Sequence, residues 1–197
     1  MKTRFTACLT TLILSVFFSI SASADVVEVD GINYDISETT ATVTSGYYSG
    51  DMVIPESITF ENSIYSVTSI RDRAFQSCSS LTSVTIPNSV TSIGESAFLN
   101  CSSLTHPIIV NDMFVFLPTG YEGHYSIPEN ISTIIGGAFN SCSSLTSVTI
   151  PNSVTSIEYY AFANCKNIEN VYCYPSFAAV CTINSIKNVK YQQISAK

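Results

Sequence analysis

Two histidines are the residues in this chain whose chemistry could support catalysis near neutral pH. His106 and His124 both lie in the segment between residues 104 and 127, and imidazole is the side chain that exchanges protons most readily at that pH. The sequence contains none of the GxSxG, HExxH, GxxxxGK[ST] or GxGxxG motifs that organise hydrolase, metallopeptidase or nucleotide chemistry. We therefore interpret both histidines as polar surface residues and predict that the chain is not an enzyme.

Acidic side chains are the other candidates for acid–base chemistry. Glycoside cleavage needs two carboxyl groups held at a fixed separation. Asp72, Glu95 and Glu158 each occur shortly before an Ala-Phe pair, so their recurrence marks them as surface residues of a repeated unit. Nothing in the sequence positions two of them together.

Cysteines recur at regular intervals after residue 24. Four of them, Cys78, Cys101, Cys142 and Cys165, keep one spacing pattern, whereas Cys173 and Cys181 break it. Equivalent side chains on neighbouring parallel strands lie about 4.8 Å apart, while a disulfide needs Cβ atoms at roughly 3.5–4.5 Å. We expect the regular column to consist of buried free thiols and leave a bridge between the last two open.

Metal and cofactor binding are not indicated by these residues. Neither a CxxC nor an HxxxH spacing is present, and structural zinc sites are normally built on such pairs. We therefore predict no metal site and no cofactor.

The elements that must position these residues are defined by an internal repeat. The segment 78–93 recurs letter for letter at 142–157, and Ala-Phe pairs occur at 74–75, 97–98, 138–139 and 161–162. The unit is thus 23 residues, with 18 extra residues in one interval. Within a unit, Val84-Thr85-Ile86 alternates as a short strand does before a Pro-Asn turn. Such a unit must stack on its neighbours to bury its apolar side, which predicts a repeat solenoid with a parallel sheet on one face.

The repeated pattern LxxVxIPxSVxxIxxxAFxxCxx resembles the BspA-like leucine-rich repeats over about residues 52–175. This resemblance implies a leucine-rich repeat fold and a secreted or surface protein that adheres to host matrix or to other cells. One position departs from the general leucine-rich pattern, because Ser89 and Ser153 stand where Asn or Cys is usual and only Asn130 supplies an amide. We expect the interior cysteine column to take a place comparable to the usual asparagine ladder.

Several segments outside the regular unit read as β-hairpins. Insertions near 58–67 and 106–122 centre on Glu61-Asn62 and on Asn111-Asp112, and the second is expected to emerge from the stack and extend the sheet sideways. Structural capping and partner binding both remain open as their roles. Residues 25–51 carry an Asp30-Gly31 hairpin signal and are expected to form an N-terminal cap, and 176–197 a C-terminal cap or tail.

The first 24 residues have the features of a cleaved signal peptide. Lys2 and Arg4 precede an apolar segment that ends in Ala22-Ser23-Ala24. We predict an exported product that is secreted, displayed on the cell surface or periplasmic, with no membrane insertion after cleavage.

The chain has a net charge of −7, which becomes −9 without the two leader cations. A nucleic-acid partner is therefore excluded, because such binding needs a basic surface.

Outward-facing strand positions form the expected binding face. They are Ser83, Thr85, His124, Ser126, Ser147 and Thr149, with Tyr172 and Tyr174 near the end of the row. Our leading hypothesis is a recognition module that binds a protein of the host matrix or of a bacterial surface through this face. A carbohydrate-binding accessory protein with stacking tyrosines is the first alternative, disfavoured by the absence of Trp. A periplasmic structural or inhibitory partner is the second.

Overall fold

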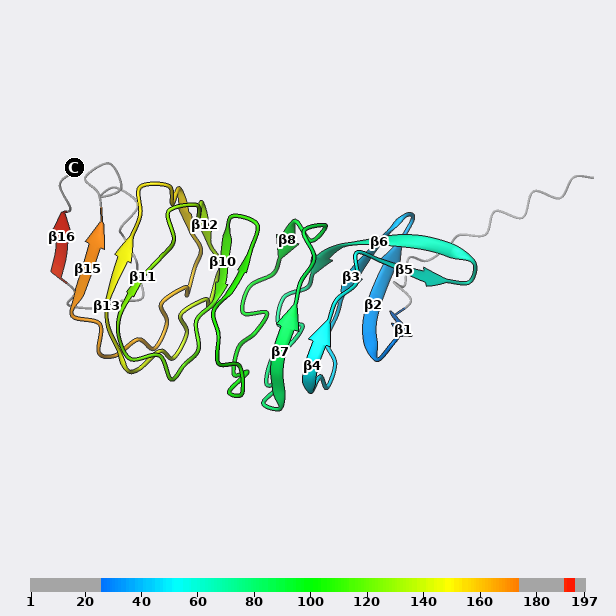
Figure 1. Cartoon of the computed structure of the whole chain (residues 1–197), viewed down its shortest axis with the longest axis horizontal. Coiled ribbons are helices and arrows are strands. Elements are labelled where there is room, and N and C mark those ends of the chain that lie inside the picture. The colour runs from blue at the N-terminus through cyan, green and yellow to red at the C-terminus, as the bar shows by residue number, and fades with distance from the viewer. Residues whose placement is uncertain (1–25, 174–189, 194–197) are drawn as a thin grey trace, which may run out of the picture.

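The chain winds into an elongated stack of coils (Figure 1). A computed structural model describes residues 26–173 and the backbone of 190–193. Within these residues every regular element is a β-strand. The N-terminal strands lie at one end of the long axis and β16 lies at the other (Figure 1). The predicted repeat solenoid is thereby confirmed.

One side of the solenoid carries the parallel strands expected from the repeat. These strands are β4 (Gly50–Val53), β7 (Leu81–Thr85), β11 (Gly123–Ser126), β13 (Leu145–Ile150), β15 (Asn170–Cys173) and β16 (Lys190–Gln193). They form two separate sheets, β4-β7 and β11-β13-β15-β16. The predicted parallel face therefore exists, but it is interrupted between β7 and β11.

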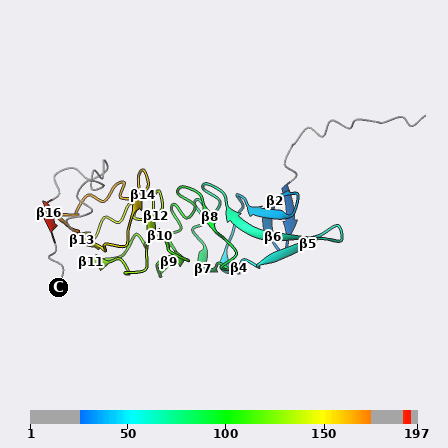
Figure 2. The same ribbon diagram turned by 90° about the horizontal axis from the view of Figure 1, so that it is seen from above.

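Short strands line the other side of the coils. Figure 2 shows β8 (Ser92–Ile93), β10 (Met113–Phe116), β12 (Thr133–Ile134) and β14 (Ser156–Ile157) opposite β7, β11 and β13. β10, β12 and β14 pair in parallel, and β8 pairs with β6 (Ser63–Ile70). β7, β11 and β13 are thus each followed by a two-residue strand, β8, β12 and β14, on the opposite side of the coil.

An antiparallel sheet covers the N-terminal end. β1 (Val26–Val29), β2 (Ile32–Ser37) and β3 (Thr40–Val43) pair antiparallel in sequence, and Asp30 and Gly31 adopt the positive φ values, 50° and 78°, of a tight hairpin turn. β5 (Ser57–Phe60) and β6 form the expected hairpin around Glu61-Asn62. Because β6 pairs with both β3 and β8, this hairpin joins the cap to the coils.

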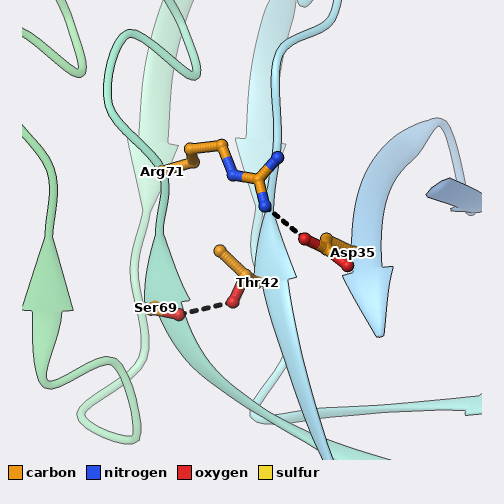
Figure 3. A network of polar contacts seen from close by, with 4 residues as sticks. All are labelled: Asp35, Thr42, Ser69 and Arg71. Atoms are coloured by element: carbon orange, nitrogen blue, oxygen red, sulfur yellow. Dashed lines mark hydrogen bonds and ion pairs between the residues drawn. The ribbon is translucent and has the colours of Figure 1, made fainter. Parts of the chain in front are cut away.

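Polar contacts strengthen the junction between the cap and the first coil (Figure 3). The Arg71 guanidinium, just after β6, reaches across β3 to form an ion pair with Asp35 on β2. Below it, the hydroxyl groups of Thr42 and Ser69 lie 2.7 Å apart. The cap is therefore tied to the solenoid by side chains as well as by the β3-β6 ladder.

The second inserted hairpin lies inside the stack, contrary to expectation. β9 (Ile108–Val110) and β10 pair antiparallel as predicted. However, all four residues of β10 are buried, and β10 continues the parallel row of β12 and β14. The hairpin carries too many apolar side chains to project into water, because Met113 to Phe116 would expose an entire apolar strand. It serves as a shortened coil.

Pro107 accounts for the interruption of the parallel face. Leu104 follows Cys101 just as Leu81 follows Cys78, so the chain enters the third coil as a normal unit. Pro107 then stands at the place of Val84, and proline has no N–H to donate to a ladder. Residues 104–107 consequently form no strand.

A row of phenylalanines runs through the interior. Phe75 stacks on Phe98 with centroids 4.7 Å apart, and Phe139 stacks on Phe114 at 4.8 Å and on Phe162 at 4.4 Å. At the centre the contact loosens, because Phe98 and Phe116 are 6.4 Å apart and tilted. The core divides into two clusters at β10, whose Phe116 lies in the first cluster with Phe98 and whose Phe114 lies in the second with Phe139.

The periodic cysteines connect successive coils. All four are buried free thiols, as predicted. The Sγ atoms of Cys101 and Cys165 donate hydrogen bonds to the carbonyl oxygens of Phe75 and Phe139 at 3.0 and 2.9 Å. These bonds confirm that the cysteine column takes the place of an asparagine ladder. Ser89 and Ser153, at the usual asparagine position, have buried hydroxyls without a partner in the described part of the chain.

Candidate functional site

The most organised polar feature lies on the sheet formed by β11, β13 and β15. We define the polar face as His124, Ser126, Ser147, Thr149 and Tyr172. The parallel register places His124 beside Ser147, Ser126 beside Thr149, and Thr149 beside Tyr172. The structure thus brings together five of the eight residues that the sequence singled out.

Hydrogen bonds converge on the His124 ring. Nδ1 lies 2.8 Å from Ser147 Oγ, and Nε2 lies 3.1 Å from both Ser126 Oγ and Thr149 Oγ1. The Tyr172 ring meets the imidazole edge-on at a centroid distance of 5.8 Å. These contacts hold the imidazole in one orientation on an exposed surface, because both ring nitrogens have hydroxyl partners.

This arrangement differs from a catalytic dyad. A serine nucleophile is activated by a histidine whose other nitrogen is oriented by a third group, commonly a carboxylate. Here Nε2 faces two further hydroxyls, and in residues 26–173 no carboxylate contacts the ring. The geometry therefore supports ligand binding by a fixed set of hydrogen-bond donors and acceptors better than it supports nucleophilic catalysis.

The remaining predicted positions lie on the other segment of the parallel face or beyond the described residues. Ser83 and Thr85 are exposed on β7, which does not pair with β11. The predicted outward positions therefore lie on two separate sheets. Tyr174, and the pairing of Cys173 with Cys181, fall outside the described residues.

Asp51 is a polar residue of this face that sequence reasoning missed. It lies opposite Ser83 on β4, and its Oδ1 accepts hydrogen bonds from the hydroxyls of Ser83 at 2.7 Å and Thr82 at 2.8 Å. These bonds hold the pKa of the Asp51 carboxyl below its usual value. The Ile-Pro pair at 54–55, which aligns with that at 86–87, would have identified Asp51 as the first outward position.

The other candidate groups have structural partners. Asp72 Oδ1 accepts a hydrogen bond from the Glu95 backbone at 2.9 Å, and Glu158 Oε2 accepts one from Gly136 at 2.8 Å. His106 is exposed beside Thr105. Asp72 and Glu158 thus bind the backbone of a neighbouring coil, a role that the sequence did not predict. Within the described ranges no three His, Cys, Asp or Glu side chains cluster in a way that would hold a metal ion.

The fold and the face define a leucine-rich repeat solenoid. The chain belongs to the family of the BspA type leucine rich repeat region, whose model matches residues 48–169 and 114–193 with six copies. The resemblance inferred from the repeated pattern is thereby confirmed. No curated protein is similar enough to count as a match.

Solved structures of bacterial leucine-rich repeat proteins are similar to this chain. One from Bacteroides capillosus is 30% identical, with 75% of this chain and 97% of that chain covered and a TM-score of 0.47. A leucine-rich repeat protein of T. pallidum is 25% identical over 75% and 71%, with a TM-score of 0.49. A leucine rich cell surface protein of Faecalibacterium prausnitzii is 25% identical over 78% and 55%, with a TM-score of 0.47.

Among residues 26–173 and 190–193, no helix has the length and apolar character that crossing a membrane requires.

Proposed function

We propose that this chain is an exported recognition module that binds a protein partner through the polar face and carries out no chemistry of its own. The observation that carries the proposal is the hydrogen-bonded arrangement of His124 with Ser126, Ser147 and Thr149. Its side chains are already ordered before a ligand arrives, so less conformational entropy is lost on binding.

Tyr172 gives this surface an anchor for a partner. Its ring packs against His124 at the edge of the hydroxyl cluster, and tyrosines combine a large apolar ring with a polar end at protein interfaces. An ordered polar centre beside an aromatic ring is a combination of groups that suits contact with a protein partner. Extended sheets of repeat solenoids commonly serve as binding surfaces.

Adhesion is the biological role that we infer for this binding. The family membership and the surface protein of F. prausnitzii support a location at or beyond the cell surface. Host matrix proteins and surface proteins of other bacteria are the partners that we propose. Cell fractionation tests the location, because recovery only from the periplasm would instead favour a structural or inhibitory partner inside the envelope.

The test is saturation binding of residues 25–197 to immobilised fibronectin, fibrinogen and mucin at low and high salt. We expect saturable, salt-tolerant binding to one of them, since the polar face contains no Asp, Glu, Lys or Arg. The double variant Ser147→Glu/Thr149→Glu should weaken binding by about tenfold or more, because it places two desolvated charges in the interface. Ser156→Glu is the matched control, since Ser156 is exposed on β14 on the opposite side of the same coil. Unchanged affinity of the double variant would exclude the polar face.

A carbohydrate ligand is the second candidate, and a groove favours it. A hollow of about 580 Å³ is lined by Asn100, Ser102, Thr119, Gly120, Ser141, Ser143 and Ser144, and all of these except Gly120 carry a hydroxyl or amide group. Such a lining offers hydrogen bonds to a neutral polyol. Binding to a glycan panel without binding to any protein would favour this function.

A further inference from the structure

A second concave surface lies at the N-terminal end of the parallel face. Here the Asp30-Gly31 turn of the cap and β4 border a hollow of about 300 Å³ that is open to solvent. Its principal lining residues are Asp30, Ile32, Tyr47, Tyr48, Asp51 and Val53. We call this hollow the N-terminal pocket.

The pocket presents negative charge without a cation to balance it. Residues 26–70 contain seven acidic side chains and no Lys, Arg or His. The one ion pair in the described part of the chain joins Arg71 to Asp35 and leaves Asp30 and Asp51 without a cationic partner. Thr82 and Ser83 both donate to Oδ1 of Asp51, so they fix the carboxylate while Oδ2 stays available to a ligand.

Apolar and aromatic groups stand beside these carboxylates. The Tyr47 side chain is fully exposed, and Val53 is 67% exposed. Ile32 and Tyr48 are buried and form a firm base, where the Tyr48 hydroxyl donates a 2.7 Å hydrogen bond to the carbonyl oxygen of Thr44. A fixed floor, one free aromatic ring and two carboxylates are therefore combined in a single hollow.

We propose that the N-terminal pocket receives an arginine side chain of the protein partner. The guanidinium matches the pocket because it donates hydrogen bonds in a planar fork to carboxylates and also stacks on aromatic faces. Its methylene chain packs on apolar surface such as Val53 while the charge remains at the carboxylates. Lysine offers a compact charge without the planar stacking surface and fits less well.

The inference rests on the proposed function, since it names the chemistry of one contact of the partner. Arginine is among the residues that contribute most to binding energy at protein interfaces. The pocket includes Asp51, which lies in the outward row of the parallel face. A partner that lies along the parallel face would therefore place one basic residue in the N-terminal pocket, at the N-terminal end of that face.

The test is an NMR titration of ¹⁵N-labelled residues 25–197 with the peptide acetyl-Gly-Arg-Gly-amide. The reference peptide carries citrulline, which has the same shape as arginine but no charge. We expect saturable shifts of the backbone amides at 30–32 and 47–53 with arginine, about tenfold weaker binding with citrulline, and weakening by salt. Because no partner protein is used, a negative result here leaves the proposed polar-face binding open to its own test.

Two variants and a control complete the test. Asp30→Asn removes a charge but keeps a residue favourable to the hairpin turn, and Tyr47→Ala removes the stacking ring. Each should weaken arginine binding by about threefold or more, with the remaining spectrum unchanged. Glu129→Gln removes an exposed charge far along the chain and should change nothing. Equal binding of the two peptides, shifts located elsewhere, no saturable shift, or full affinity of both pocket variants would overturn the proposal.

Discussion

Single thiol groups perform a structural task in this molecule that amides perform in many leucine-rich repeats. Cys101 and Cys165 donate from Sγ to the carbonyl oxygen of the preceding coil. Burial raises the pKa of Cys101, Cys142 and Cys165 to about 12. A thiol held in its protonated form both preserves this hydrogen bond and remains chemically inert.

The raised thiol pKa values predict that the protein loses stability in alkali. In the unfolded chain a cysteine ionises near pH 9, whereas in the folded chain these three resist ionisation up to about pH 12. Their stabilising contribution is therefore complete below about pH 9 and falls as the pH rises toward 12. At pH 10.5, ionisation of each of these thiols in the unfolded chain should lower the free energy of unfolding by up to about 2 kcal/mol.

Urea titrations under reducing conditions at pH 8.5 and 10.5 check this expectation. The unfolding midpoint should be clearly lower at the higher pH. Cys142→Ala should begin from a lower midpoint, because it leaves a cavity, but should lose less on going to high pH. Equal midpoints of the unaltered chain at the two pH values would contradict it.

At the scale of elements, the turns between strands determine how closely coils approach. Gly94 lies against the preceding coil, where its N–H donates to the carbonyl of Ile70 at 2.9 Å. A Cβ atom added to Gly94 would lie only 2.6 Å from the Cα of Asp72. The backbone of a neighbouring coil cannot move away as a flexible side chain can.

Gly94→Ala should therefore destabilise the protein by about 1–3 kcal/mol. Gly120→Ala is the matched control, because its Cβ would meet no heavy atom within 4 Å. The control should stay within about 0.5 kcal/mol of the original. Denaturant midpoints of the two variants give the comparison, and equal midpoints would show that the coils can separate at little cost.

The sequence predicted elements better than their placement. The 23-residue period, the hairpin turns and the cysteine column were readable because each depends on local residue types. The apolar residues Met113 to Phe116 and the missing N–H of Pro107 are local signals of the buried hairpin and of the gap. The pairing of β10 with β12 depends on a later part of the chain, and no local pattern contains that information. The convergence of Ser126, Ser147 and Thr149 on His124 likewise depends on register across two coils.

At the scale of the whole molecule, the solenoid consists of two halves with weaker coupling at the centre. Each half has its own apolar cluster and its own parallel sheet. β10 joins the two halves, because Phe116 packs against Phe98 in the first cluster and Phe114 packs against Phe139 in the second. A backbone hydrogen bond of 2.7 Å from the Ser96 N–H to the Gly136 carbonyl also connects successive coils there. In stacked repeats each unit is stabilised mainly by its nearest neighbours.

A cavity made in one half should therefore loosen that half first. Phe139→Ala removes a ring packed between Phe114 and Phe162 and should cost about 3–5 kcal/mol locally. Amide hydrogen exchange should rise strongly in β11, β13 and β15 and much less in β4 and β7. Phe75→Ala should give the reverse pattern, and Phe139→Leu serves if the alanine variant unfolds entirely. A uniform rise in exchange over both halves would contradict this expectation. It would show that the two halves unfold as one unit although their parallel sheets are separate.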